Sequence, residues 1–96
     1  MGKKATYALG MVETLGLATS IEVADTMLKT AHVSIVNQEE VSMALYTIFV
    51  EGDISAVQMA VEAGITVARR TGALIAYDII PNPEKSSKKL TKRRSK

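Results

Sequence analysis

The chain has 96 residues, enough for one domain with a modest hydrophobic core. It contains no cysteine, which excludes a disulfide framework, thiolate metal sites and cysteine nucleophiles. No apolar run approaches the roughly 20 residues that a membrane-spanning helix needs, and the N-terminus leads into strand-like alternation instead of a signal-peptide core. The sequence therefore predicts a soluble, cytosolic protein that does not bind a membrane.

The net charge of +2 conceals two oppositely charged parts. Residues 5–83 carry nine acidic and three basic side chains, a net charge of −6, whereas residues 84–96 carry one acid and seven bases, a net of +6. This differs from a uniformly basic nucleic-acid binder. Residues 84–96 also have almost no apolar side chains, so we expect a flexible basic tail, and residues 1–6 form a short N-terminal extension.

The first half of the chain predicts a strand, a helix and a second strand. Residues 7–13 alternate as a strand does, and Gly10 within them indicates a bend or a close backbone approach. A capping-box pattern at 19–22 marks a helix start, although the family named below would begin this helix nearer Leu17. Apolar residues then recur at three- and four-residue spacing and predict a buried stripe. This stripe consists of Ile21, Ala24, Met27, Leu28 and Ala31.

The second strand is followed by a polar loop, a third strand, a second helix and a last strand. Residues 33–36 are expected to form a strand, 37–40 a polar loop and 45–50 a third strand rich in β-branched and aromatic residues. Asp53 is a suitable N-cap for the next helix, and Gly72 is suited to follow its end. The apolar face of this helix is predicted to comprise Val57, Ala60, Val61, Gly64, Ile65 and Ala68.

Gly64 indicates that this second helix crosses the sheet closely, and Arg69 and Arg70 suit the negative end of the helix dipole. A last strand over 74–80 is stopped by Pro81 and Pro83. The predicted order is β-α-β-β-α-β. It defines an α+β, ferredoxin-like split βαβ fold, with an antiparallel sheet and both helices on one face.

The sequence offers little for catalysis. His32 is the one histidine, and we expect an ordinary surface or boundary residue there, because a general base needs a target within hydrogen-bond reach. The pair Glu39 and Glu40 is better explained as a solvated loop than as an acid–base dyad. The residues around Tyr46 and Phe49 do not match the aromatic motifs of RNA-binding sheets. We therefore expect that the protein is not an enzyme and that it binds no metal and no cofactor.

Several segments resemble the bacterial microcompartment shell proteins of the single-domain, hexamer-forming class (BMC domain). The resemblance runs without a gap from residue 8 to about residue 83, close to four-fifths of the chain. The segments that carry it are ALGMVET at 8–14, IEVAD at 21–25 with MLK at 27–29, EGD at 51–53, EAG at 62–64 and IIP at 79–81.

The resemblance implies roles for residues at the edge of a hexamer. The lysine on the first helix of such proteins packs beside its counterpart from a neighbouring hexamer, and the matching residue is Lys29, with Asp25 one turn earlier as an orienting partner. The same two residues could also form a simple helical ion pair. Family members carry an arginine between two prolines after the last strand. Here that position is Asn82, which lacks the charge and reach of a guanidinium, so extended tiling is less firmly expected than hexamers.

The pore loop is where the chain departs most from the family it resembles. Typical members have a Lys-Ile-Gly-Ser-Gly loop, and the aligned residues are Glu40, Val41, Ser42, Met43 and Ala44. The loss of both glycines makes positive φ angles costly. Met43 takes the place of the pore-facing serine, and Glu40 reverses the charge near the opening. The alternative is that the loop refolds and these residues pack against their neighbours.

The resemblance implies that residues 7–83 form a shell domain. Such a domain would assemble into homohexamers that tile with other shell proteins around encapsulated enzymes and control metabolite passage through a central pore. The expected location is a bacterial microcompartment in the cytoplasm. The alternative is a divergent relative that binds small molecules or associates with nucleic acid as a regulator, for which salt-dependent binding that needs residues 85–96 would be the test.

Overall fold

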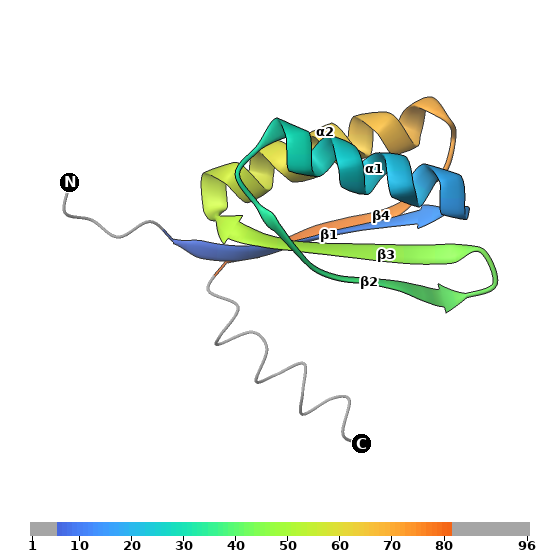
Figure 1. Cartoon of the computed structure of the whole chain (residues 1–96), viewed down its shortest axis with the longest axis horizontal. Coiled ribbons are helices and arrows are strands. Elements are labelled where there is room, and N and C mark those ends of the chain that lie inside the picture. The colour runs from blue at the N-terminus through green and yellow to red at the C-terminus, as the bar shows by residue number, and fades with distance from the viewer. Residues whose placement is uncertain (1–5, 82–96) are drawn as a thin grey trace, which may run out of the picture.

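The computed structural model describes residues 6–81, which form a four-stranded antiparallel sheet with two helices on one face (Figure 1). The expected tail at 84–96 and most of the N-terminal extension lie outside the described residues. The elements, in chain order, are β1 (Tyr7–Leu15), α1 (Leu17–Thr30), β2 (Ser34–Ser42), β3 (Leu45–Asp53), α2 (Ile54–Arg70) and β4 (Leu74–Pro81). The strand order β2-β3-β1-β4 confirms the predicted split βαβ fold.

Alternation along β1 places every second residue beneath the helices. Ala8, Val12 and Thr14 are fully buried on that side. A Cβ added at Gly10 would lie 2.7 Å from side-chain atoms of both Val57 and Val61. The close backbone approach predicted at Gly10 is thus confirmed, and α2 is the element that approaches.

The helix α1 begins at Leu17, which confirms the start implied by the resemblance and shows that the capping-box start at residue 19 was wrong. Its N-cap is Gly16, with φ of 94° and no side-chain capping bond. The buried side chains are Ser20, Val23, Ala24 and Met27, so the core stripe is displaced from the predicted one. Ser20 tolerates burial because its hydroxyl donates to the Leu17 carbonyl at 2.7 Å.

The helix α2 has the predicted boundaries. The Asp53 carboxylate accepts a hydrogen bond from the Ser55 amide at 3.3 Å. At the other end, the Gly72 amide donates to the Arg69 carbonyl and the Ala73 amide to the Ala68 carbonyl, which is the Schellman pattern. The buried residues are Val57, Ala60, Val61, Gly64, Val67 and Ala68. Val67 therefore takes the place predicted for the half-buried Ile65.

Gly64 allows the close approach of the two helices to each other. A Cβ there would lie 3.1 Å from atoms of Met27 and Val23, both on α1. The expectation that Gly64 serves a crossing over the sheet was therefore wrong.

The strand β2 runs through the segment that was predicted to be a loop. It extends over Ser34–Ser42 and pairs with β3 from Ser34 to Ser42, with register shifts near both ends. Residues 37–40 are all exposed, because β2 is an edge strand and its polar side chains face water. The prediction of a loop rested on polarity, which on an edge strand is compatible with full backbone pairing. The strand β3 likewise continues to Asp53, three residues beyond its predicted end.

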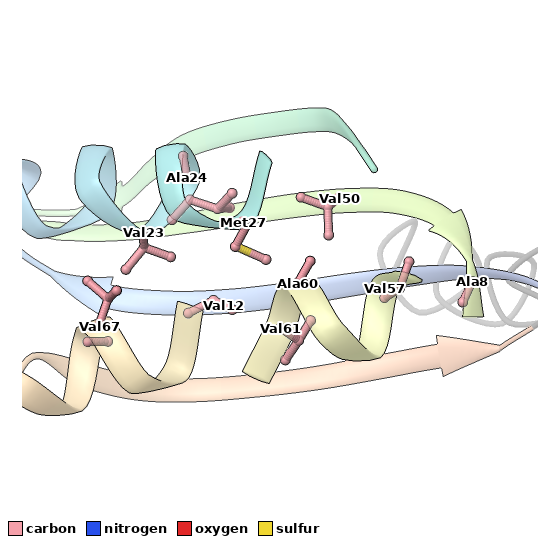
Figure 2. Packing of buried hydrophobic residues seen from close by; sticks show 12 residues of the cluster. Ala8, Val12, Val23, Ala24, Met27, Val50, Val57, Ala60, Val61 and Val67 are labelled. Atoms are coloured by element: carbon pink, nitrogen blue, oxygen red, sulfur yellow. The ribbon is translucent and has the colours of Figure 1, made fainter. Parts of the chain in front are cut away.

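The core lies between the sheet and the two helices (Figure 2). It is built from small and β-branched side chains, with Met27 the largest that is fully buried. Its members come from α1, α2 and the two central strands, with the edge strands supplying only partly buried residues. Within residues 6–81, neither helix is long and apolar enough to cross a membrane.

Candidate pore hairpin and assembly surfaces

The expected pore segment forms the tip of the β2–β3 hairpin. Glu40, Val41 and Ser42 end β2, and Met43 and Ala44 form the turn to β3. Met43 is 89% exposed, the highest value among the large hydrophobic residues of the described range 6–81. Met43 therefore does not pack into the core of its own subunit. Whether these residues line a pore depends on assembly.

The turn keeps the backbone shape that glycine would favour. Ala44 has φ of 67° and is the one non-glycine residue within residues 6–81 with a positive φ. Left-handed backbone costs a non-glycine residue roughly 1–2 kcal/mol. The Ala44 carbonyl accepts a hydrogen bond from the Gly16 amide at 2.6 Å, which ties the turn to the start of α1. The tip is thereby held in place, and Met43 projects from a fixed support.

A cleft of about 340 Å³ lies beside this hairpin. Its apolar wall includes Leu17 and Ile21 of α1 and Tyr46 of β3, and Glu39 and Glu40 of β2 form an acidic rim. The rim carboxylates are exposed, and the cleft lining contains no lysine, arginine, histidine or cysteine. This surface combines an apolar wall with negative charge, so it suits a partner that carries apolar and positively charged groups.

The apolar wall of this cleft belongs to a second stripe on α1. Leu17, Ile21 and Leu28 are separated by four and seven residues, so they share one face of the helix. Their exposed fractions are 55%, 56% and 46%. The prediction that Ile21 and Leu28 belong to the core was therefore wrong. The spacing of the three residues beside the core stripe was the pattern that could have revealed a separate exposed face.

Lys29 and Asp25 form an ion pair on the exposed surface of α1. The Lys29 Nζ lies 2.9 Å from an Asp25 carboxylate oxygen, and the side chains are 75% and 57% exposed. The hydrogen bond to Asp25 raises the pKa of Lys29 above the usual 10.5. The C-terminal end of α1 lies at the opposite end of the sheet from the β2–β3 turn (Figure 1). Asn82, the third expected edge residue, lies outside the described residues.

The structure does not bring His32 together with other reactive groups. His32 is exposed in the connection between α1 and β2, as predicted. Within residues 6–81, no three histidine or acidic side chains are grouped so that they could hold a metal ion. Among the described residues, the hairpin tip, the cleft and the surface of α1 are the features to which a function can be assigned.

The BMC domain family model matches residues 8–83, and the chain belongs to this family. It is 45% identical over 83 residues to the bacterial microcompartment shell protein PduA of Citrobacter freundii, covering 86% of this chain and 89% of PduA. It is 40% identical over 81 residues to the carboxysome shell protein CcmK2 of Synechococcus elongatus, covering 82% and 79%.

A further relative and a solved structure agree with this assignment. The shell protein EutM of Escherichia coli K12 is 42% identical over 76 residues, covering 79% of this chain and 78% of EutM. A microcompartment protein from Desulfitobacterium hafniense has the same fold, with a TM-score of 0.76 and 37% identity. That match covers 81% of this chain but only 42% of the solved chain, so this protein spans less than half the length of that one.

Proposed function

We propose that this protein is a structural shell subunit of a bacterial microcompartment, located in the cytoplasm, and that it assembles into cyclic homohexamers. The observation that carries this proposal is the family match over residues 8–83, together with relatives that are microcompartment and carboxysome shell proteins. These relatives do not favour the alternative of a small-molecule-binding or nucleic-acid-associated regulator. The shell-protein names of these relatives support a structural and not an enzymatic role.

The two flanks of the subunit support a ring. One flank carries the edge strand β2 and the exposed apolar stripe of α1, and the other carries the edge strand β4, with Ile75 and Tyr77 each 50% exposed. Because the flanks differ, a contact between them is heterologous, and heterologous contacts close into rings when the rotation permits. Burying the apolar side chains of both flanks in subunit contacts stabilises the ring by about 25 cal/mol per Å² of apolar surface.

In the proposed ring, the hairpin tip faces the six-fold axis and the end of α1 that carries Lys29 faces outward. The two sites lie at opposite ends of the sheet, which allows both placements in one orientation (Figure 1). Six copies of Met43 would then converge on the axis. Lys29, oriented by Asp25, would contact neighbouring hexamers or other shell proteins in a layer around encapsulated enzymes. Asn82 in place of an arginine weakens that lateral contact.

Electron microscopy of the purified protein tests the shell assignment. We expect sheets, tubes or closed shells with a hexagonal lattice, formed by the protein alone or with a second shell protein from the same host. Dispersed particles without six-fold symmetry under both conditions would contradict the proposal. A mutant with the surface charge reversed at Lys29 serves as the matched control, because it should retain single hexamers while losing the lattice.

A further inference from the structure

Two arginines at the end of α2 have no ion-pair partner among residues 6–81. Among residues 6–81, the single ion pair joins Lys29 to Asp25, so neither Arg69 nor Arg70 has a carboxylate within 4.0 Å. Both arginines are exposed. They are the two remaining cations in an acidic domain whose residues 5–83 carry a net charge of −6.

The two arginines leave the helix in different directions. Arg69 lies one turn after Ile65, which is partly buried against the core cluster, so it projects close to the sheet. Arg70 lies one turn after the exposed Thr66 and projects toward solvent. Arg69 is therefore the better placed of the two to reach a neighbour across the β4 flank.

The acidic rim of the cleft on the opposite flank contains a carboxylate that is equally free. Glu40 pairs in register with Tyr46, which places it on the helix side of the sheet beside the cleft. Glu39 accepts a hydrogen bond from the Asn37 amide group at 2.8 Å. In the part of the chain that the structure describes, Glu40 has no hydrogen-bond or ion-pair partner.

Arg69 and Glu40 lie toward the same end of the molecule. The C-terminal end of α2 and the β2–β3 turn are both at the end of the sheet opposite the start of β2 (Figure 1). In a ring whose axis passes near this end, rotation brings the β4 flank of one copy against the cleft flank of the next while keeping both groups near the axis. We propose that Arg69 of each subunit enters the cleft of the adjacent copy and pairs with its Glu40. This inference rests on the proposed hexamer.

The chemistry of the two surfaces is complementary. Arginine is the cation best suited to an interface, because its planar guanidinium is weakly hydrated and binds a carboxylate through two parallel hydrogen bonds. Its aliphatic stem would cover the apolar wall formed by Leu17 and Ile21. Each subunit contributes one arginine and one glutamate, so a closed ring leaves no pair incomplete.

Charge reversal within one chain tests the pair. We expect Arg69→Glu and Glu40→Arg each to raise the subunit concentration at which hexamers dissociate by about tenfold or more, as followed by native mass spectrometry. The double variant, in which every interface carries the exchanged pair, should return to within about threefold of the wild-type value. Arg70→Glu and Glu62→Arg, at exposed positions of α2 that do not line the cleft, are the matched controls and should have much smaller effects.

The outcomes separate this inference from the proposed function. If the wild-type protein forms hexamers but the double variant dissociates as readily as the single variants, the pairing is wrong and the shell assignment stands. If the wild-type protein forms no hexamer, the proposed function itself fails. Should a reversed variant not fold, as judged by circular dichroism, the neutral variants Arg69→Gln and Glu40→Gln replace it. Additive effects in their double-mutant cycle would equally overturn the pair.

Discussion

At the scale of single residues, the hairpin tip shows how this chain differs from the family it belongs to. Ala44 keeps a positive φ of 67° where the typical loop carries glycine. Met43 is 89% exposed at the position matched to the pore-facing serine. Ala44 thus adopts the left-handed backbone that glycine favours, and the residue before it carries a long apolar side chain.

Substituting Met43 tests the effect of this change on permeation. We expect a ring of six Met43 side chains to form an apolar constriction, which resists wetting and impedes polar solutes. Met43→Gly should increase the flux of a small polar metabolite into closed shells, as measured by the turnover of an encapsulated reporter enzyme. Met43→Leu, which keeps the apolar bulk, is the control. Equal flux in the wild-type, glycine and leucine variants would show that Met43 does not restrict the pore.

Lys29 is expected to act between hexamers and not within them. Lys29→Ala removes the charge and the methylene stem that would pack on a neighbour, so hexamers should persist while sheets and tubes disappear in electron micrographs. Thr30→Ala, on the same exposed helix end, is the control. If the Lys29→Ala protein dissociates into monomers, Lys29 contributes to the interface within the hexamer and not to the contact between hexamers.

The pH dependence of this contact follows from the direction of the pKa shift. Asp25 raises the pKa of Lys29 in the folded protein, so the ion pair is fully present below the ordinary lysine pKa of 10.5. Titration of Lys29 removes the ion pair as the pH rises through the raised value. Layer formation should therefore not change across the neutral range through titration of Lys29.

At the scale of the elements, two glycines set how closely the layers of the domain approach. Gly10 faces the stiff side chains of Val57 and Val61 at 2.7 Å, measured from an added Cβ. Gly64 faces the flexible Met27 and the stiffer Val23 at 3.1 Å. The contact at Gly10 is tighter, and its neighbours have fewer rotamers with which to yield.

We therefore expect Gly10→Ala to be the more destabilising substitution. It should reduce the free energy of unfolding by about 1–3 kcal/mol through overpacking. Gly64→Ala should change it by less than about 1 kcal/mol, because the gain in helix propensity offsets the crowding. Urea unfolding measures the free energy of unfolding of both variants. The subunit concentration must be the same in each experiment, because assembly contributes to apparent stability. Equal losses for the two variants would contradict this account of the packing.

More of the fold than of the candidate functional surfaces could be predicted from the sequence. Alternation, Asp53 as a cap and Gly72 as a helix end fixed the order of the elements, because these patterns depend on local backbone chemistry. The polar residues of β2 were mistaken for a loop, since pairing with β3 is a long-range contact. Ile21 was mistaken for core because local spacing does not distinguish a face buried in the subunit from one left for a partner. The cleft, which needs α1, β2 and β3 together, was not foreseen.

At the scale of the whole molecule, the charge separates into an acidic domain and the basic residues that follow it, and we expect the domain to assemble without those residues. Deleting residues 85–96 removes seven cations but none of the residues assigned to the ring contacts. We expect the truncated protein to remain hexameric by light scattering, with changed solubility or cargo association. A version with the seven cations replaced by serine separates the effect of charge from that of length. Monomers after truncation would show that these residues are part of the assembly.

The central claim is that this acidic domain, with unlike flanks, closes into a ring. Native mass spectrometry of the intact chain at low micromolar concentration tests it most directly. The account predicts a main species of about six times the 10.3 kDa chain mass, as expected for a closed cyclic oligomer, which persists on dilution. A monomer or dimer whose mass does not change with concentration would contradict the account.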